Sequence, residues 1–457
     1  MIRFPYRILL IGLISLIVAA CGAVQPTRNN VEQLEGKQPN AVGANTANSK
    51  KAIKDPMKMS AEGQQYFNAG LTAGANGQLK QAEQAFNQAM RKDPEAPQPL
   101  YNLGVVFERR GADLKALQYY RASIQKKGDY SPALAAAARL LLRYGKSDQA
   151  ISTMRSAANK SPDNIKVLIL YADILNGAQK YEDAIRVAKR ALRIDERSAM
   201  AMLQIGKANL KMDRVELAEA IFNQVLSINE NIAEVYFLQG LLELKKGFRI
   251  LAIKKFEKAI EINPFYPEAL NNLAIEYMYA GNYSSAIILL ERAIQITPSW
   301  GILYLNYGNA LRGAGKWRRA LASFQRAQKM LPGAPAVIFD MAVLYYAANE
   351  LGGMTRIARL KKSKELFARF KAQKGGGTGE GNSADQLDDA VKYIKELDVL
   401  IQREQVRMQR QQEAAARQKE RQQPKAQPDQ PGRNGVAGKS GSGDADGWEN
   451  ADDDGWE

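Results

Sequence analysis

Small and large apolar positions recur at a fixed spacing along most of the chain. Eight segments of equal length follow one another without insertion. They begin at Gly63, Pro97, Ser131, Ile165, Ala199, Ala233, Pro267 and Gly301. Position 20 is alanine in all eight, position 8 is glycine or alanine, position 24 is mostly large, and proline stands at position 32 in five. Small residues let two helices approach closely, and proline ends a helix because it lacks a donor. The pattern predicts antiparallel helix pairs, with the large residue at position 24 filling the space between neighbouring pairs.

This pattern resembles the tetratricopeptide repeat, which has the same period of about 34 residues. The copy at 304–332, YLNYGNALRGAGKWRRALASFQRAQKMLP, shows it best, and the resemblance covers about 63–334. It implies an all-α superhelical solenoid of eight to nine helix-turn-helix repeats. It also implies that the first helix of each repeat lines a concave groove, with positions 2, 5, 6, 9, 12 and 13 pointing inward.

The array is expected to span 61–374 and to end in a polar cap. A ninth first helix is predicted at 335–347, and its basic partner at about 354–373 is displaced by a Gly-Gly interruption. Solenoids need polar terminal repeats to end in water. The stretch 375–383 is glycine-rich and predicts a linker.

A further helix is predicted at 384–423. Its first part is amphipathic, because Leu387, Val391, Ile394, Leu397 and Ile401 recur at steps of three and four. Its second part is polar and charged. It is either a solvated helix whose first half packs on the array or a coiled-coil helix. The apolar seam covers only about two heptads, which favours the first interpretation.

The start of the chain has the features of a secretory signal peptide at 1–20. Arg3 and Arg7 precede an uncharged apolar run of thirteen residues, Ile8 to Ala20, which is short for a membrane span. The stretch 18–21, VAAC, resembles the lipobox of bacterial lipoproteins. That resemblance implies cleavage before Cys21 and acylation of its sulfur, and Gly22 in place of aspartate implies the outer membrane. The alternative is a secreted protein whose only cysteine is accidental.

Two segments are predicted to be disordered because they hold too few apolar residues to form a core. The first is a tether that follows the acylated Cys21 to residue 60. The second is the tail at 424–457, which is acidic at its end and contains DGWE twice, with Trp448 and Trp456. The repeated motif predicts a docking peptide for another protein, for its own array or for a neighbouring molecule. The alternative is a solubilising end.

Composition argues against catalysis. The chain has no histidine, and its one cysteine is assigned to the lipid. Histidine bases, thiol nucleophiles and the usual zinc ligands are therefore missing. We expect no enzyme activity, no metal, no cofactor and no small-molecule substrate. The formal charge of +16 does not indicate nucleic acid, because an export signal separates the protein from it.

Candidate binding residues occupy the inward positions of the first helices. Asparagines lie toward both ends of the groove, at Asn68, Asn102, Asn272, Asn306 and Asn309. The resemblance implies a ladder of amides that bind a peptide backbone, although asparagine at position 6 also belongs to the repeat consensus. The middle repeats carry bases, at Arg139, Arg143, Lys207, Lys211 and Lys245. They predict a basic band for an extended, partly acidic peptide, or simply a solvated face.

The layout of lipobox, tether, long array, charged helix and tail resembles the tetratricopeptide lipoproteins of bacterial gliding-motility envelope complexes. It implies a non-enzymatic scaffold, lipid-anchored in the outer membrane and facing the periplasm, that binds periplasmic or outer-membrane proteins. Similar layouts occur in lipoproteins that assemble type IV pilus secretins or outer-membrane barrels. A further alternative is a peptidoglycan-associated regulator that recruits a wall enzyme.

Overall fold

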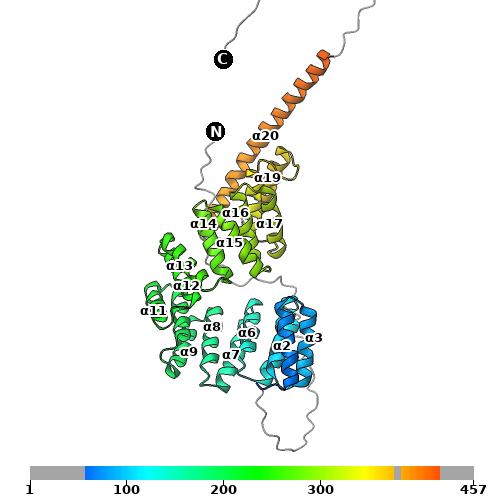
Figure 1. Ribbon diagram of the computed structural model, residues 1–457. Helices are drawn as coiled ribbons and strands as arrows, with labels where there is room; N and C mark the ends of the chain where they lie inside the picture. Colours follow the sequence, from blue (N-terminus) through cyan, green and yellow to red (C-terminus); the bar gives the residue numbers. More distant parts are fainter. Residues whose placement is uncertain (1–56, 375–381, 423–457) are drawn as a thin grey trace, which may run out of the picture. The chain divides into compact units, whose positions relative to one another are not determined.

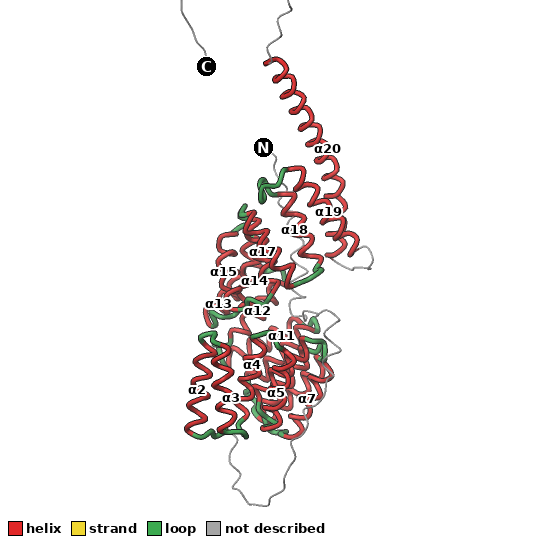
Figure 2. Tube along the Cα trace, turned by 90° about the vertical axis from the view of Figure 1, so that its right-hand side faces the viewer, coloured by secondary structure: helices red, strands yellow, loops and turns green. Residues whose placement is uncertain are grey.

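The computed structural model describes residues 57–374 and 382–422. The predicted signal peptide, Cys21, most of the tether, and the tail with Trp448 and Trp456 lie outside these residues, as do 375–381 of the predicted linker. Every regular element in the described ranges is helical (Figure 2). The predicted all-α solenoid is therefore confirmed.

The helices form nine successive pairs, followed by α20 (Asn382–Gln422). The first helices of the pairs are α2 (Ala61–Ala75), α4 (Pro97–Arg109), α6 (Ser131–Arg143), α8 (Ile165–Gly177), α10 (Ala199–Lys211), α12 (Ala233–Lys245), α14 (Pro267–Tyr279), α16 (Gly301–Gly313) and α18 (Pro335–Ala347). The second helices are α3 (Leu79–Lys92), α5 (Asp113–Lys126), α7 (Ser147–Lys160), α9 (Tyr181–Ile194), α11 (Val215–Ile228), α13 (Arg249–Ile262), α15 (Tyr283–Ile296), α17 (Trp317–Met330) and α19 (Arg356–Lys374). From α2 to α19, consecutive helices pack against each other (Figure 1).

Side-chain size at positions 8 and 24 is matched within each of the eight aligned repeats. Where position 8 is glycine, an aromatic ring at position 24 of the same repeat covers it. The glycine–ring pairs are Gly70–Phe86, Gly104–Tyr120, Gly206–Phe222, Gly240–Phe256 and Gly308–Phe324, and a Cβ on these glycines would lie 2.4 to 2.5 Å from a ring carbon. Where position 8 is alanine, position 24 is the smaller Met154, Ala188 or Leu290. These rings contact the first helix of their own pair. That position 24 also fills the space between neighbouring pairs stays a prediction.

The turn inside each repeat uses one backbone conformation. Position 15 has positive φ in all eight aligned repeats, and in six of them it is glycine, as at Gly247 (φ 85°). Gln179 and Asp213 take the same conformation with φ of 61° and 64°. Glycine is favoured there because a Cβ is crowded in the left-handed region.

The end of the array is closed by α18, α19 and the first part of α20. Tyr393 of α20 stacks on Phe367 with ring centroids 4.9 Å apart, and its ring lies 5.2 Å from that of Tyr346. The Tyr346 hydroxyl donates to Glu396 at 2.6 Å, and Leu397 is fully buried. This part of α20 therefore packs as a further helix on the ninth pair.

The chain divides into two compact units, with the boundary between Leu400 and Ile401. The described part of the second unit is the helical stretch from Ile401 to Gln422, whose side chains Val406 and Met408 are exposed. Within the described ranges, no helix combines the length and the apolar character that crossing a membrane requires.

Candidate functional site

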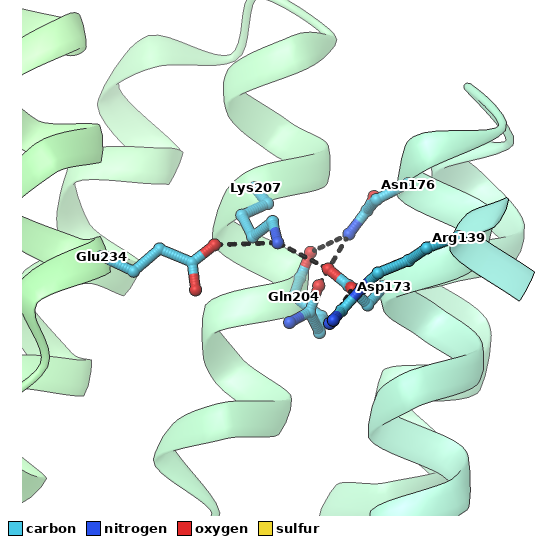
Figure 3. A network of polar contacts seen from close by, with 6 residues as sticks. All are labelled: Arg139, Asp173, Asn176, Gln204, Lys207 and Glu234. Carbon is cyan, nitrogen blue, oxygen red and sulfur yellow. Dashed lines mark hydrogen bonds and ion pairs between the residues drawn. The ribbon is translucent and has the colours of Figure 1, made fainter. Parts of the chain in front are cut away.

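Opposite charges alternate along position 9 of the middle repeats. Arg139, Asp173 and Lys207 stand at this position on α6, α8 and α10. The Lys207 ammonium lies 2.6 Å from Asp173 Oδ1 and 2.9 Å from an oxygen of Glu234 on α12. Arg139 Nη2 approaches the second Asp173 oxygen at 3.7 Å (Figure 3). One polar network therefore joins four consecutive first helices.

Two amides on α8 and α10 lie beside these ion pairs (Figure 3). Asn176 on α8 donates to both the backbone oxygen (3.0 Å) and the side-chain oxygen (3.2 Å) of Gln204 on α10. Burial alone would lower the pKa of Lys207, but Asp173 and Glu234 outweigh it and raise that pKa. Lys207 is therefore held charged between two carboxylates.

Arg143 makes a second junction between repeats 2 and 3. Its guanidinium lies 3.2 Å from Glu108 and 3.0 Å from Asp113. The Tyr144 hydroxyl donates to Asp113 at 2.6 Å. Burial, followed by this hydrogen bond, raises the pKa of Tyr144 to about 12.

The predicted basic band is thus alternately charged rather than uniformly basic. Lys245 pairs with Asp213, so four of the five predicted bases face carboxylates from other repeats or turns. Lys211 is the exception, since it is exposed and has no partner among the described residues. Pairing lowers the net field that an acidic ligand would meet along position 9.

The predicted asparagine ladder divides into two kinds of residue. Asn68 is exposed and accepts from Gln64 at 2.9 Å within its own helix. Asn102 and Asn272 donate to backbone carbonyls one turn earlier, at 2.9 and 2.8 Å. Within residues 57–374 these three amides bond inside their own helices, and their contact with a ligand stays a prediction.

Asn306 and Asn309 instead hold neighbouring repeats together. Asn306 is 2 % exposed and donates to Asn271 at 2.8 Å. Asn309 donates to Asp340 on α18 at 2.7 Å and accepts from Arg312 at 3.0 Å. Burial raises the pKa of Asp340, although Arg312 and Asn309 oppose that shift. A ligand would have to displace these bonds to reach either amide.

Leu71, Met200 and Arg139 are among the inward side chains that remain open for contact. Leu71 on α2 is 44 % exposed and Met200 on α10 is 43 % exposed, although both are large and apolar. The side chain of Arg139 is 66 % exposed in spite of its contact with Asp173.

Sequence reasoning missed the carboxylates of this face. Asp173 and Glu234 were not candidates, although Asp173 stands one repeat period after Arg139 and one period before Lys207. Comparing the charge at one repeat position with the next copy of that position would have found the alternation. Leu71 and Met200 share positions with other apolar residues, and only their exposure distinguishes them.

Replacing Lys207 with methionine is expected to destabilise the array by about 2 kcal/mol, because two carboxylates lose their shared base. The pKa of Lys207 is raised in the folded state. Its contribution is therefore complete below the ordinary lysine pKa and is lost as the pH rises through the raised value. Thermal unfolding should show a deficit near neutral pH that shrinks in strong alkali.

Lys211→Met on the same helix is the matched control, since Lys211 is exposed and unpaired among the described residues. It should leave stability within about 0.5 kcal/mol. Equal losses in the two variants would contradict the role given to Lys207.

The geometry defines a class of protein, a stacked series of antiparallel helix pairs. The family described as tetratricopeptide repeat matches residues 67–132, 135–199, 172–231 and 305–353, and a second model of that description matches 267–300. Together these matches cover more than half of the chain. The chain belongs to the tetratricopeptide-repeat family.

Several solved structures are similar to parts of this chain at low identity. A tetratricopeptide repeat protein from Parabacteroides merdae is 18 % identical, with 55 % of this chain and 100 % of that chain covered and a TM-score of 0.44. MamA protein is 23 % identical over 36 % of this chain and 91 % of its own, with a TM-score of 0.30. The APC/C hetero-tetramer Cut9–Hcn1 is 12 % identical, with 68 % of this chain and 59 % of that chain covered and a TM-score of 0.49.

A search of curated proteins finds no match. The family matches include no enzyme family, and tetratricopeptide arrays are typically non-catalytic scaffolds for protein–protein interaction. The partners of such an array are proteins.

Proposed function

We propose that this chain is a non-enzymatic scaffold of a bacterial envelope, anchored by a lipid on Cys21 and binding protein partners through its first-helix face. The observation that carries the binding role is the exposure of Leu71, Met200 and Arg139 at inward positions. A partner that buries these apolar side chains gains about 25 cal/mol per Å² of apolar surface removed from water.

The anchor is supported by sequence alone. The apolar run before Cys21 is too short to span a membrane comfortably, and the small residues before the cysteine suit a lipoprotein signal. We propose an outer-membrane location that faces the periplasm, within a gliding-motility type of complex. Pilus-secretin or barrel-assembly lipoproteins and a regulator of a wall enzyme are the alternatives.

The anchor is tested by replacing Cys21 with serine. Membrane fractions should lose the protein, and incorporation of labelled palmitate should cease, because the sulfur that takes the lipid is gone. A Cys21→Ser protein that stays in the membrane fraction would exclude the lipid anchor. Release by detergent rather than retention with peptidoglycan would separate an assembly scaffold from a wall regulator.

The binding face is tested by affinity capture from detergent-solubilised envelopes. The variant combines Leu71→Glu and Met200→Glu, which place charge where an apolar contact is proposed. Ile194→Glu is the matched control, since Ile194 is 46 % exposed at the end of a second helix. Proteins lost with the double variant and kept with the control would be partners of this face. Identical captured sets would refute the proposed face.

A further inference from the structure

Two surface features meet at one edge of the array. We define the turn edge as the edge where the first helix of each repeat ends and the second begins. Among the five first helices α4, α6, α8, α10 and α12, four have a basic last residue. These residues are Arg109, Arg143, Lys211 and Lys245. The fifth, α8, ends in Gly177.

These bases differ from Lys207, whose side chain is only 20 % exposed. The side chains of Arg143 and Lys245 are 44 % and 46 % exposed despite their carboxylate partners. Arg109 is exposed and donates to the backbone oxygen of Gly74 at 2.9 Å. Lys211 has no partner among the described residues. Positive charge is therefore available at the turn edge.

Large apolar side chains lie at the same edge in repeats 5 and 6. Leu217 and Leu251 are the third residues of α11 and α13, and they are 49 % and 46 % exposed. Phe248 and Ile250, at the start of α13, are 55 % and 73 % exposed. Burial of these side chains by a partner would be favourable, at about 25 cal/mol per Å² of apolar surface.

A ligand that fits this edge must combine aromatic groups with carboxylates. The segment 443–457 has seven aspartates and glutamates, no lysine or arginine, and tryptophan twice in the sequence DGWE. We propose that this segment of the chain docks on the turn edge of repeats 5 and 6. Its indoles contact the exposed apolar side chains, and its carboxylates pair with Lys211 and Lys245.

The number of anchors matches the number of equivalent places on the edge. Repeat 5 offers Lys211 with Leu217, and repeat 6 offers Lys245 with Leu251 at the same two repeat positions. Trp448 and Trp456 are eight residues apart, a stretch that spans at most about 28 Å. Equivalent positions one helix pair apart are separated by at most about 20 Å. Both anchors can therefore bind together, which raises the overall affinity.

The test is photo-crosslinking in the full, detergent-solubilised chain. Trp456 is replaced with the photoreactive residue p-benzoylphenylalanine, and the crosslinked peptides are mapped by mass spectrometry. Crosslinks are expected at 211–217 and 245–251. Lys211→Glu with Lys245→Glu should lower their yield about tenfold, because attraction becomes repulsion. A synthetic peptide of residues 443–457 added in excess should also lower it.

The matched control is Lys160→Glu with Lys189→Glu, which makes the same change in charge at exposed lysines outside the turn edge. It should leave the yield unchanged. Crosslinked products of one-chain or of two-chain mass both support docking, within a molecule or between copies. Crosslinks confined to other residues, or a yield that Lys211→Glu with Lys245→Glu does not lower, would overturn the proposal. These readouts do not depend on the envelope location or on the first-helix face.

Discussion

Replacing Arg249 with alanine is expected to destabilise repeats 6 and 7 by about 3 kcal/mol, because it leaves a carboxylate buried without its base. Arg249 Nε lies 2.9 Å from one oxygen of Glu276, and Nη2 lies 3.3 Å from the other. The side chain of Glu276 is 1 % exposed, whereas that of Arg249 is 41 % exposed. The guanidinium also lies 3.7 Å from the centroid of the Tyr279 ring. Water thus reaches Arg249 far more easily than Glu276. Removing Arg249 therefore leaves the Glu276 carboxylate without a partner and without water.

This deficit should depend on pH with a defined sign. Burial raises the pKa of Glu276, and Arg249 opposes the rise. Without Arg249 the folded-state pKa rises further above the unfolded value. Because the pKa of Glu276 is higher in the folded protein than in the unfolded chain, its contribution to stability is fully present below the unfolded-state pKa. That contribution is lost as the pH rises through the folded-state pKa. The deficit of Arg249→Ala should therefore be small near about pH 4 and large near about pH 7.

Amide hydrogen exchange in α13 and α14 measures this effect where it arises, because stability in a repeat array is partly local. Glu276→Gln should recover much of the loss in the Arg249→Ala background by removing the buried charge. Arg186→Ala is the control, since the Arg186–Asp183 pair is exposed on both sides and such pairs contribute little. A deficit that is the same at both pH values would contradict the role of the buried acid.

Gly240→Ala is the second large effect, with an expected loss of about 2 kcal/mol from overpacking. The added Cβ would lie 2.5 Å from a ring carbon of Phe256, which is fully buried and has no room to move away. The second helix of repeat 6 would have to shift. Thermal unfolding and hydrogen exchange in α12 and α13 would report the loss.

A second substitution supplies the control for this prediction. Repeat 7 already combines alanine at position 8 with leucine at position 24, as Ala274 and Leu290. Gly240→Ala with Phe256→Leu should therefore be more stable than the sum of the single losses predicts. The double-mutant cycle measures that coupling. Strictly additive losses would show that the two positions do not constrain each other.

Much of the fold was predictable because its determinants recur. Alanine at position 20 and the small residue at position 8 report close helix packing in every copy, and the helix from Pro335 to Ala347 follows from the same register. The role of position 24 was not predictable from its size alone. It depends on which helix the ring meets, and the match between Gly240 and Phe256 becomes meaningful only once the two are known to touch.

The candidate site was predicted less well, and the reason is physical. Each base was considered as a residue facing solvent, whereas a charge on a stacked repeat first meets the charge one repeat away. Asp173 satisfies Lys207 before any ligand does. Repeat position also did not predict burial. Asn68 and Asn306 share position 6, but Asn68 is exposed and Asn306 is 2 % exposed.

The alternation of Arg139, Asp173 and Lys207 has a consequence for how the chain reaches its fold. Stacked repeats have similar packing surfaces, so a helix pair can mistakenly stack on a copy that lies two repeats away. Skipping the repeat of Asp173 would bring Arg139 against Lys207, two positive charges without the carboxylate between them. Repulsion destabilises such a mispaired intermediate. The correct order is stabilised by two ion pairs, Arg139–Asp173 and Asp173–Lys207. The charges at this position therefore distinguish repeats 3 to 5 from one another, and they favour assembly of the middle of the array in the correct order.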